Sequence, residues 1–213
     1  MSENVIRLQR RGLLLVISAP SGCGKSVVLQ QVLQSSAGLV YSVSVTSRAP
    51  RGAEVDGRDY HFVTRERFEQ LIRENAFYEW AEVHGNLYGT RVDTIEAALA
   101  GGLDVALDID VQGGLAVKRR SPDAVLVFLL PPSREVLEQR LRGRASDTEE
   151  QIRLRLDNAM REMEFWPQYD FVLINDRLEE TVAAARQILE AERRRASRQR
   201  LMGNAECGMR NAE

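Results

Sequence analysis

The stretch that most constrains the fold is APSGCGKS, residues 19–26, together with its flanks. Before it, GLLLVIS (12–18) is a short apolar run typical of a buried strand, and after it VVLQQVLQSS (27–36) has helical spacing. A strand, a glycine loop and a helix in this order predict a P-loop, whose backbone N–H groups and helix N-terminus point at phosphate oxygens. One position departs from the pattern G-x-x-x-x-G-K-[ST], because Ala19 stands where the first glycine is usual.

Lysine usage supports the same interpretation. Among 29 basic residues only Lys25 and Lys118 are lysine, and the others are arginine. An ammonium group is compact enough to sit between phosphate oxygens where a planar guanidinium is too bulky. Sampling chance is the alternative, but a lysine kept at the P-loop position of an arginine-rich chain favours a working loop.

The loop residues predict separate tasks. Gly22 and Gly24 let the backbone wrap closely around phosphate without a Cβ clash. Lys25 would bridge the β- and γ-phosphates, and the hydroxyl of Ser26 would hold Mg²⁺. Ala19 is tolerated if its backbone stays in the β region and is damaging only if the position needs a positive φ.

Cys23 lies inside the loop, near a helix N-terminus and Lys25, and both features lower a thiol pKa. One hypothesis is that a thiol reagent modifies Cys23 and that bound ATP protects it. The alternative is a small residue at a variable loop position. The two histidines, His61 and His84, have no metal-ligand partners in the sequence and are interpreted as structural.

Composition sets wider bounds. The chain has 213 residues, a formal net charge of -2 and 44% hydrophobic residues, which suits one large domain or a core with insertions. No apolar run approaches the roughly 20 residues that span a bilayer, and the polar N-terminus lacks a signal-peptide core. Cys23 and Cys207 lie too far apart in sequence to suggest a disulfide framework or a zinc cluster. We therefore expect a cytoplasmic protein, with no argument for a membrane or nucleic-acid partner.

The chain beyond the loop alternates strands with helices. LDVALDI (103–109), AVLVFLL (124–130) and FVLIN (171–175) are buried-strand runs, and helical patterns lie between them. This alternation predicts an α/β fold: a P-loop parallel sheet flanked by helices. Residues 41–92 break the rhythm and predict an insertion of mixed α and β structure, in which YSVSVTSR alternates like a strand. Capping boxes are expected at Asp93 with Glu96 and at Asp147 with Glu150, and Gly101-Gly102 should stop a helix.

Five stretches carry a family resemblance: SVSVTSRAPRGAEVDGRDYHFV (42–63), FYEWAEVHGNLYGT (77–90), LDIDVQG (107–113), RGRASDTEEQIRLRL (142–156) and VLIND (172–176). In this order they resemble guanylate kinases, and the resemblance runs from Leu14 to about Arg195. It implies transfer of a phosphoryl group from ATP to GMP or dGMP, with Mg²⁺ as cofactor. It also implies three parts: a P-loop core (1–43, 98–139 and 156–200), a GMP-binding region (44–97) and a helical lid (140–155). The tail, 201–213, is expected to be flexible.

The resemblance also implies the acceptor site. Glu79 would accept hydrogen bonds from the guanine N1–H and amino group, where adenine presents an acceptor at N1. The remaining contacts to GMP would come from an acid, two hydroxyls and a phosphate-binding set: Asp110; Ser44 and Thr90; Arg48, Arg51, Tyr60 and Tyr88. The alternatives are a solvated carboxylate for Glu79, a turn or helix cap for Asp110 and an exposed basic turn for RAPR.

The donor site and the catalytic set follow from the same resemblance. Asp108 ends an apolar strand like a Walker-B acid and would bind the ion at Ser26 through water. The ATP site would comprise Ala19, Pro20, Ser21, Gly22, Cys23, Gly24, Lys25, Ser26 and Val27, with Asn175 at the adenine. Phosphoryl transfer would depend on Lys25, Arg48, Arg140, Arg144 and Arg155. A strand-end Asn is also a common turn former. No general base is needed, because the GMP phosphate is already an anionic nucleophile.

Two other functions remain open at this point. A non-catalytic binding module of guanylate-kinase type would not need the intact loop or the lid arginines. A kinase acting on a ribose phosphate would have no use for Glu79, Asp110 and Thr90 together. For a guanylate kinase the expected partners are the small molecules ATP and GMP or dGMP, and a homo-oligomer is left open. The binding module would instead bind a phosphorylated partner in the GMP pocket.

Overall fold

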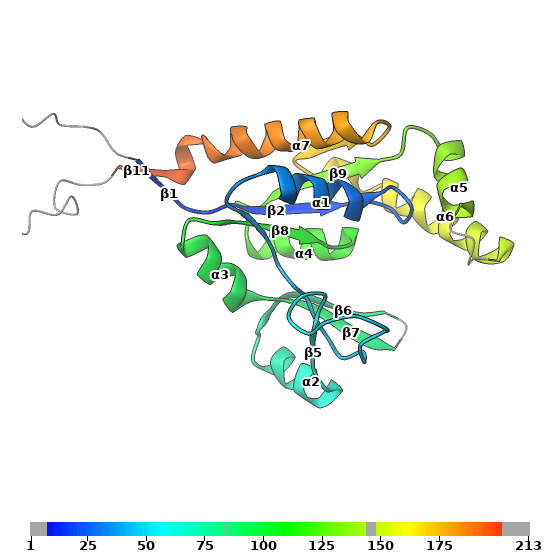
Figure 1. The fold of residues 1–213 in the computed structure, drawn as a ribbon, viewed down its shortest axis with the longest axis horizontal. Helices are drawn as coiled ribbons and strands as arrows, with labels where there is room; N and C mark the ends of the chain where they lie inside the picture. Colours follow the sequence, from blue (N-terminus) through cyan, green and yellow to red (C-terminus); the bar gives the residue numbers. More distant parts are fainter. Residues whose placement is uncertain (1–7, 84, 144–147, 202–213) are drawn as a thin grey trace, which may run out of the picture.

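A five-stranded parallel sheet forms the centre of the protein (Figure 1), in a computed structural model that describes residues 8–83, 85–143 and 148–201. The strand order is β10-β9-β2-β8-β3, and every neighbouring pair is parallel. The strands are β2 (Leu14–Ser18), β3 (Leu39–Tyr41), β8 (Asp104–Asp108), β9 (Val125–Leu130) and β10 (Phe171–Ile174). The prediction of an α/β fold with a parallel central sheet is confirmed.

Helices cover both faces of this sheet (Figure 1). Along β2, Leu15 and Ile17 pack into one core, and Leu14 and Val16 into the other, because successive strand side chains point to opposite faces. The first core takes side chains from α1 (Lys25–Ser35), α5 (Arg134–Arg142), α6 (Glu149–Met163) and α7 (Leu178–Arg193). The second takes them from α3 (Val92–Ala100) and α4 (Val111–Arg120). The continuous apolar strand runs of the sequence reflect this double burial.

The insertion forms a second, smaller sheet of order β5-β4-β7-β6, which lies apart from the central sheet in Figure 1. Its strands are β4 (Val45–Thr46), β5 (His61–Phe62), β6 (Phe77–Val83) and β7 (Asn86–Arg91), and α2 (Arg65–Arg73) packs on it. A small core of its own holds it together, in which the rings of Phe68 and Phe77 stack at 4.5 Å. The expected single strand at 41–48 is therefore wrong: it divides between β3 of one sheet and β4 of the other.

Two predicted helix starts also differ from the structure. α3 begins after Arg91 without a side-chain cap, and Asp93 instead accepts hydrogen bonds from the Arg91 guanidinium. α6 does begin with a capping box, but it is made by Thr148 and Gln151, one residue later than predicted. Asp147 lies outside the described residues. The predicted stop at Gly101-Gly102 is confirmed, and Gly102 has a φ of 80°.

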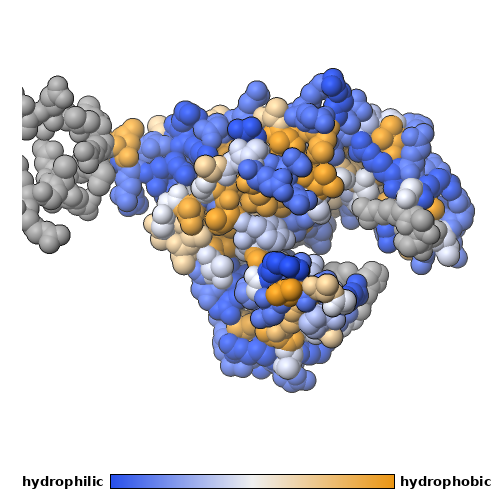
Figure 2. All heavy atoms as spheres, in the orientation of Figure 1, coloured by the Kyte–Doolittle hydropathy of each residue, from blue (hydrophilic) through white to orange (hydrophobic). Residues whose placement is uncertain are grey.

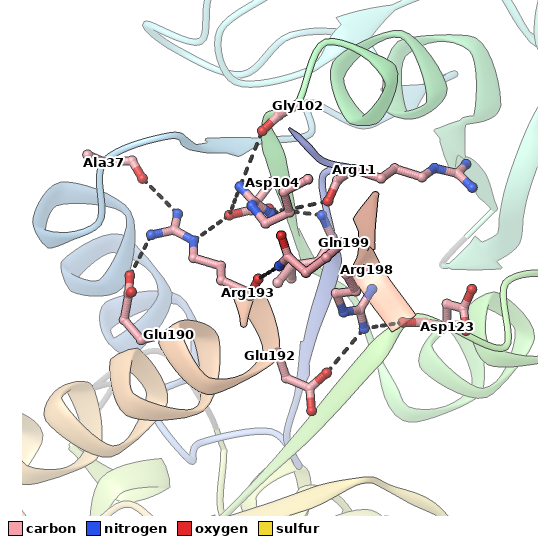
Figure 3. A network of polar contacts seen from close by, with 12 residues as sticks. Arg11, Ala37, Gly102, Asp104, Asp123, Glu190, Glu192, Arg193, Arg198 and Gln199 are labelled. Carbon is pink, nitrogen blue, oxygen red and sulfur yellow. Dashed lines mark hydrogen bonds and ion pairs between the residues drawn. The ribbon is translucent and has the colours of Figure 1, made fainter. Parts of the chain in front are cut away.

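A buried carboxylate ties two segments that are distant in sequence to the sheet. Asp104, fully buried at the start of β8, accepts hydrogen bonds from the backbone N–H of Leu13 (2.9 Å), from Nε of Arg193 (2.7 Å) and from the guanidinium of Arg10 (Figure 3). Arg10 and Arg193 belong to the ends of β1 and α7. Close by, β1 (Leu8–Arg10) pairs antiparallel with β11 (Gln199–Leu201). The remaining short elements are η1 (Trp166–Gln168) and η2 (Ala196–Arg198).

Asp104→Ala should destabilise the protein, because it leaves two largely buried guanidinium groups without their shared carboxylate. We expect the free energy of unfolding in urea to fall by about 2–4 kcal/mol. The matched control is Glu69→Gln, which removes an exposed partner of Arg65 and should cost less than about 0.5 kcal/mol. An equal loss of unfolding free energy in the two variants would show that the Asp104 network stabilises the protein no more than an exposed ion pair does.

Candidate active site

The loop between β2 and α1 has the backbone geometry of a P-loop. Gly22 and Gly24 have φ values of 92° and 82°, a region that side chains rarely adopt, and α1 begins directly after them. In the described part of the chain Asn75 is the one non-glycine residue with a positive φ, so Ala19 has a negative φ. The methyl group of Ala19 is buried in the core below the loop. Each retained glycine therefore stands where glycine is needed, and the replaced one where it is not.

An acid on the neighbouring strand contacts the loop. Asp108, the last residue of β8, lies with Oδ1 2.8 Å from Nζ of Lys25 and accepts a 2.8 Å hydrogen bond at Oδ2 from Oγ of Ser26. Lys25 also donates to the carbonyl of Ile109 at 2.8 Å. β2 and β8 are adjacent and parallel, so their carboxyl ends meet at one edge of the sheet.

The same residues fit a magnesium ion. Carboxylate and hydroxyl oxygens are the hard ligands that Mg²⁺ prefers, and Asp108 and Ser26 bring them together. Within the described ranges no group of three or more His, Cys, Asp or Glu residues could hold a metal. An ion here would therefore complete its coordination with phosphate oxygens and water, as Mg²⁺ does in other phosphoryl-transfer sites.

The environment of Cys23 is the reverse of the one expected. The side chain is fully buried, and burial raises the pKa of its thiol to about 12, although Arg140 acts in the opposite direction. The prediction that the loop lowers this pKa is wrong, because desolvation outweighs the nearby positive charge. Of the two alternatives, the structure favours a small residue that packs under the loop.

The rest of the predicted ATP site is spread along the loop. Pro20 is buried and its carbonyl accepts the backbone N–H of Cys23, Ser21 is exposed, and Val27 is exposed on α1. Sequence reasoning missed Glu162 on α6. Burial raises the pKa of its carboxyl, and a hydrogen bond from the backbone N–H of Ser21 acts in the opposite direction.

A cavity of about 240 Å³ lies between the P-loop edge and the second sheet. Its walls include five of the eight residues predicted for the acceptor, Ser44, Tyr60, Glu79, Tyr88 and Asp110, together with Asp108 of the predicted metal site. Tyr41, at the end of β3, also lines it and was not predicted. Figure 2 shows the molecule hollowed between the second sheet and the part that carries α5 and α6.

Two acids, Glu79 and Asp110, line this cavity. Oε1 of Glu79 accepts a 2.6 Å hydrogen bond from Oγ1 of Thr90, its partner across the β6–β7 hairpin. Burial raises the pKa of Glu79, Thr90 acts against this, and the charge of Asp110 adds to it. Asp110 caps α4 by accepting the backbone N–H of Gly113 at 2.7 Å, so the helix-cap alternative describes one of its contacts.

Arg48 contacts two tyrosines that line the cavity and is held from several sides. Its two terminal nitrogens lie 2.9 and 3.0 Å from the carboxylate oxygens of Glu54, Nε donates to the hydroxyl of Tyr88 at 3.2 Å, and the guanidinium lies over the ring of Tyr60. The Arg48 guanidinium holds the pKa of Glu54 below its usual range. Glu54 also accepts the backbone N–H of Arg51, whose side chain is exposed. Glu54 was missed, although its place three residues after Arg51 is the spacing of such a turn.

The predicted lid is described only in part. Arg140 on α5 donates to the backbone carbonyl of Asn175 at 3.0 Å, and its Nη1 is buried without a hydrogen-bond partner among the described residues. Arg155 lies half-buried on α6, and Arg144 lies outside the described residues. The amide of Asn175 donates to the carbonyl of Cys23 at 2.6 Å, a contact the sequence did not predict.

An α/β fold with a glycine-rich phosphate-type loop, an acid at the neighbouring strand end and a cavity against an inserted sheet is typical of a nucleoside monophosphate kinase. The similarity of this chain to known proteins identifies the family. The family profile described as guanylate kinase matches residues 11–192. The chain belongs to the guanylate kinase family.

Individual relatives agree with this assignment. The chain is 49% identical over 191 residues to a guanylate kinase of Syntrophotalea carbinolica, covering 90% of this chain and 91% of that one. It is 49% identical over 193 residues to one of Mesorhizobium japonicum, covering 90% and 88%. The crystal structure of guanylate kinase from Anaplasma phagocytophilum superposes with a TM-score of 0.73 at 36% identity, covering 90% and 92%.

The loop geometry gives a paired prediction. Gly24→Ala forces a side chain into a positive φ and places its Cβ 2.8 Å from Nδ2 of Asn175, so we expect kcat/KM for ATP to fall at least about tenfold. Ala19→Gly should change kcat/KM by less than about twofold and lower stability by about 0.4–1 kcal/mol, because it only frees the unfolded chain. Steady-state kinetics and urea unfolding measure both. A large kinetic loss in Ala19→Gly would contradict this account of the loop.

Proposed function

We propose that this guanylate kinase transfers the γ-phosphoryl group of ATP to GMP or dGMP and that Mg²⁺ accompanies the ATP. The observation that carries the proposal is the shared cavity, which Glu79 and Tyr88 line from the second sheet and Asp108 from the P-loop edge. An acceptor bound there would present its phosphate beside the phosphates held by the loop. The barrier is then lowered mainly by positioning and charge neutralisation.

Guanine would be read by Glu79. An ionised carboxylate only accepts hydrogen bonds, and guanine offers two donors, N1–H and the amino group, on one edge. The hydroxyl of Thr90 donates to Oε1 of Glu79 and so fixes the orientation of the carboxylate. Gly113 leaves room beside Oε2, since a Cβ at that position would lie 3.3 Å from it. Asp110, at the start of the same helix, would add a second acceptor.

The acceptor phosphate would lie near Tyr60 and Tyr88, which line the same cavity. Tyr60 and Tyr88 would supply hydroxyl donors, and the exposed Arg51 would supply a guanidinium. Arg48 is committed to Glu54 and Tyr88, so it would act as a fixed positive charge that orients the Tyr88 hydroxyl. The phosphate is itself the nucleophile and needs no base.

The donor phosphates would be bound by the loop N–H groups and Lys25. The ion held by Ser26 and Asp108 would supply charge neutralisation on the β- and γ-phosphates. Arg140, Arg144 and Arg155 would add positive charge around the transferred group, and closure of their segment over the cavity would exclude water.

The remaining expectations stay predictions. We propose small-molecule substrates, no nucleic-acid partner and a cytoplasmic location, with a homo-oligomer left open. No helix in the described part of the chain combines the length and apolar character of a membrane span. The binding-module alternative is disfavoured because Lys25, Ser26 and Asp108 are present and in mutual contact.

Glu79→Gln tests the proposal. It places a donor opposite a guanine donor, so kcat/KM for GMP should fall by about 100-fold or more while KM for ATP changes less than about twofold. In the unmodified protein kcat/KM for GMP should decline as pH falls through the raised pKa of Glu79, because protonation removes an acceptor; the variant should lack this decline.

The measurement is ADP release at varied GMP and pH. Glu82→Gln is the matched control, since Glu82 lies on the same strand but is exposed and pairs with Arg65. Near-normal GMP kinetics in Glu79→Gln would refute the role of Glu79 in reading guanine.

A further inference from the structure

We infer that Asn175 is a positioning residue for the P-loop, which holds the loop backbone rather than contacting the adenine of ATP. Asn175 follows β10 and is 6% exposed. Its backbone N–H donates to the carbonyl of Leu130 at 2.7 Å, so the residue continues the parallel pairing of β10 with β9. Its side chain reaches across the sheet edge, and Nδ2 donates to the carbonyl of Cys23 at 2.6 Å.

This contact sets the direction of one peptide unit in the loop. In a planar trans peptide the C=O and the following N–H point in opposite directions. Asn175 holds the carbonyl of Cys23 on the protein side, so the N–H of Gly24 is turned the other way. A P-loop needs its N–H groups turned toward the phosphates, and a carbonyl buried without a partner would cost stability.

The glycine of the motif and Asn175 fit each other. A Cβ at Gly24 would lie 2.8 Å from Nδ2 of Asn175, nearer than such atoms approach in proteins. The positive φ of Gly24 and the closeness of the amide thus both require glycine at this position. Gly24 therefore leaves room for the side-chain amide of Asn175, which holds the loop, as well as for phosphate.

The same residue contacts the predicted lid. The backbone carbonyl of Asn175 accepts a 3.0 Å hydrogen bond from Nη2 of Arg140. Nη1 of Arg140 is buried and has no hydrogen-bond partner in the described ranges. Asn175 thus places one loop N–H and one guanidinium, through its side chain and its backbone respectively.

A direct base contact and a positioning role differ in what they depend on. An adenine contact needs the amide, which is buried here and bonded to the loop. Loss of such a contact would weaken the binding only of ligands that carry adenine. A positioning role affects every ligand whose phosphates are bound by the loop, whatever base that ligand carries. The inference rests on the proposed use of ATP. Inorganic tripolyphosphate probes phosphate binding by the loop independently, because it carries no base.

The test uses the full chain with Asn175→Ala and the near-isosteric Asn175→Asp, which has no donor for the Cys23 carbonyl. Calorimetric titration with ATP and with tripolyphosphate gives the two affinities. We expect both ligands to bind at least about tenfold more weakly, by factors that agree within about twofold. Asp176→Asn, at the exposed neighbouring position, should leave both unchanged.

GMP affinity is the control for correct folding, because it depends on the cavity beside the second sheet and should be retained in the variants. Asn175→Asp takes the place of Asn175→Ala if the alanine variant does not fold. Weaker ATP binding with normal tripolyphosphate binding would overturn the inference in favour of a base contact. Unchanged binding of both ligands would overturn it outright. If the unmodified protein binds tripolyphosphate but does not phosphorylate GMP, the proposed function fails and the inference is still decided by these titrations.

Discussion

The carboxylate of Asp108, which lies 2.8 Å from both Nζ of Lys25 and Oγ of Ser26, is the interaction on which the rest of the site depends. It joins the end of β8 to the start of α1 and so fixes the P-loop against the edge of the parallel sheet. Asp104, at the other end of β8, is held by Arg10 and Arg193. A short apolar strand thus carries an acid at each end, one for the site and one for stability.

The acceptor cavity depends on the packing of two parts that the sequence separates. β6 of the inserted sheet packs against α4 of the core, which brings Glu79 beside the first turn of that helix. Thr90 and Gly113 then decide how the carboxylate is oriented and how much room remains. Selection between purines would therefore depend on the contact between the two sheets as well as on the acid itself.

Much of this arrangement could be predicted from the sequence, because apolar runs locate buried strands and parallel strands bring their carboxyl ends together. That logic places Lys25, Ser26 and Asp108 side by side. It fails where the deciding group is distant in sequence: Asn175 lies 152 positions from the carbonyl it binds. It also fails for Cys23, since charge near a thiol can be seen in a sequence but the depth of burial that raises its pKa cannot.

The most direct test of the account is ADP release by the purified protein with ATP, Mg²⁺ and each of GMP, dGMP, AMP, CMP and UMP. If the half-buried carboxylate of Glu79 accepts two hydrogen bonds from guanine, as proposed, GMP and dGMP should have a kcat/KM at least about 100-fold above the others. Comparable turnover of AMP and GMP, or none of any nucleotide, would contradict it.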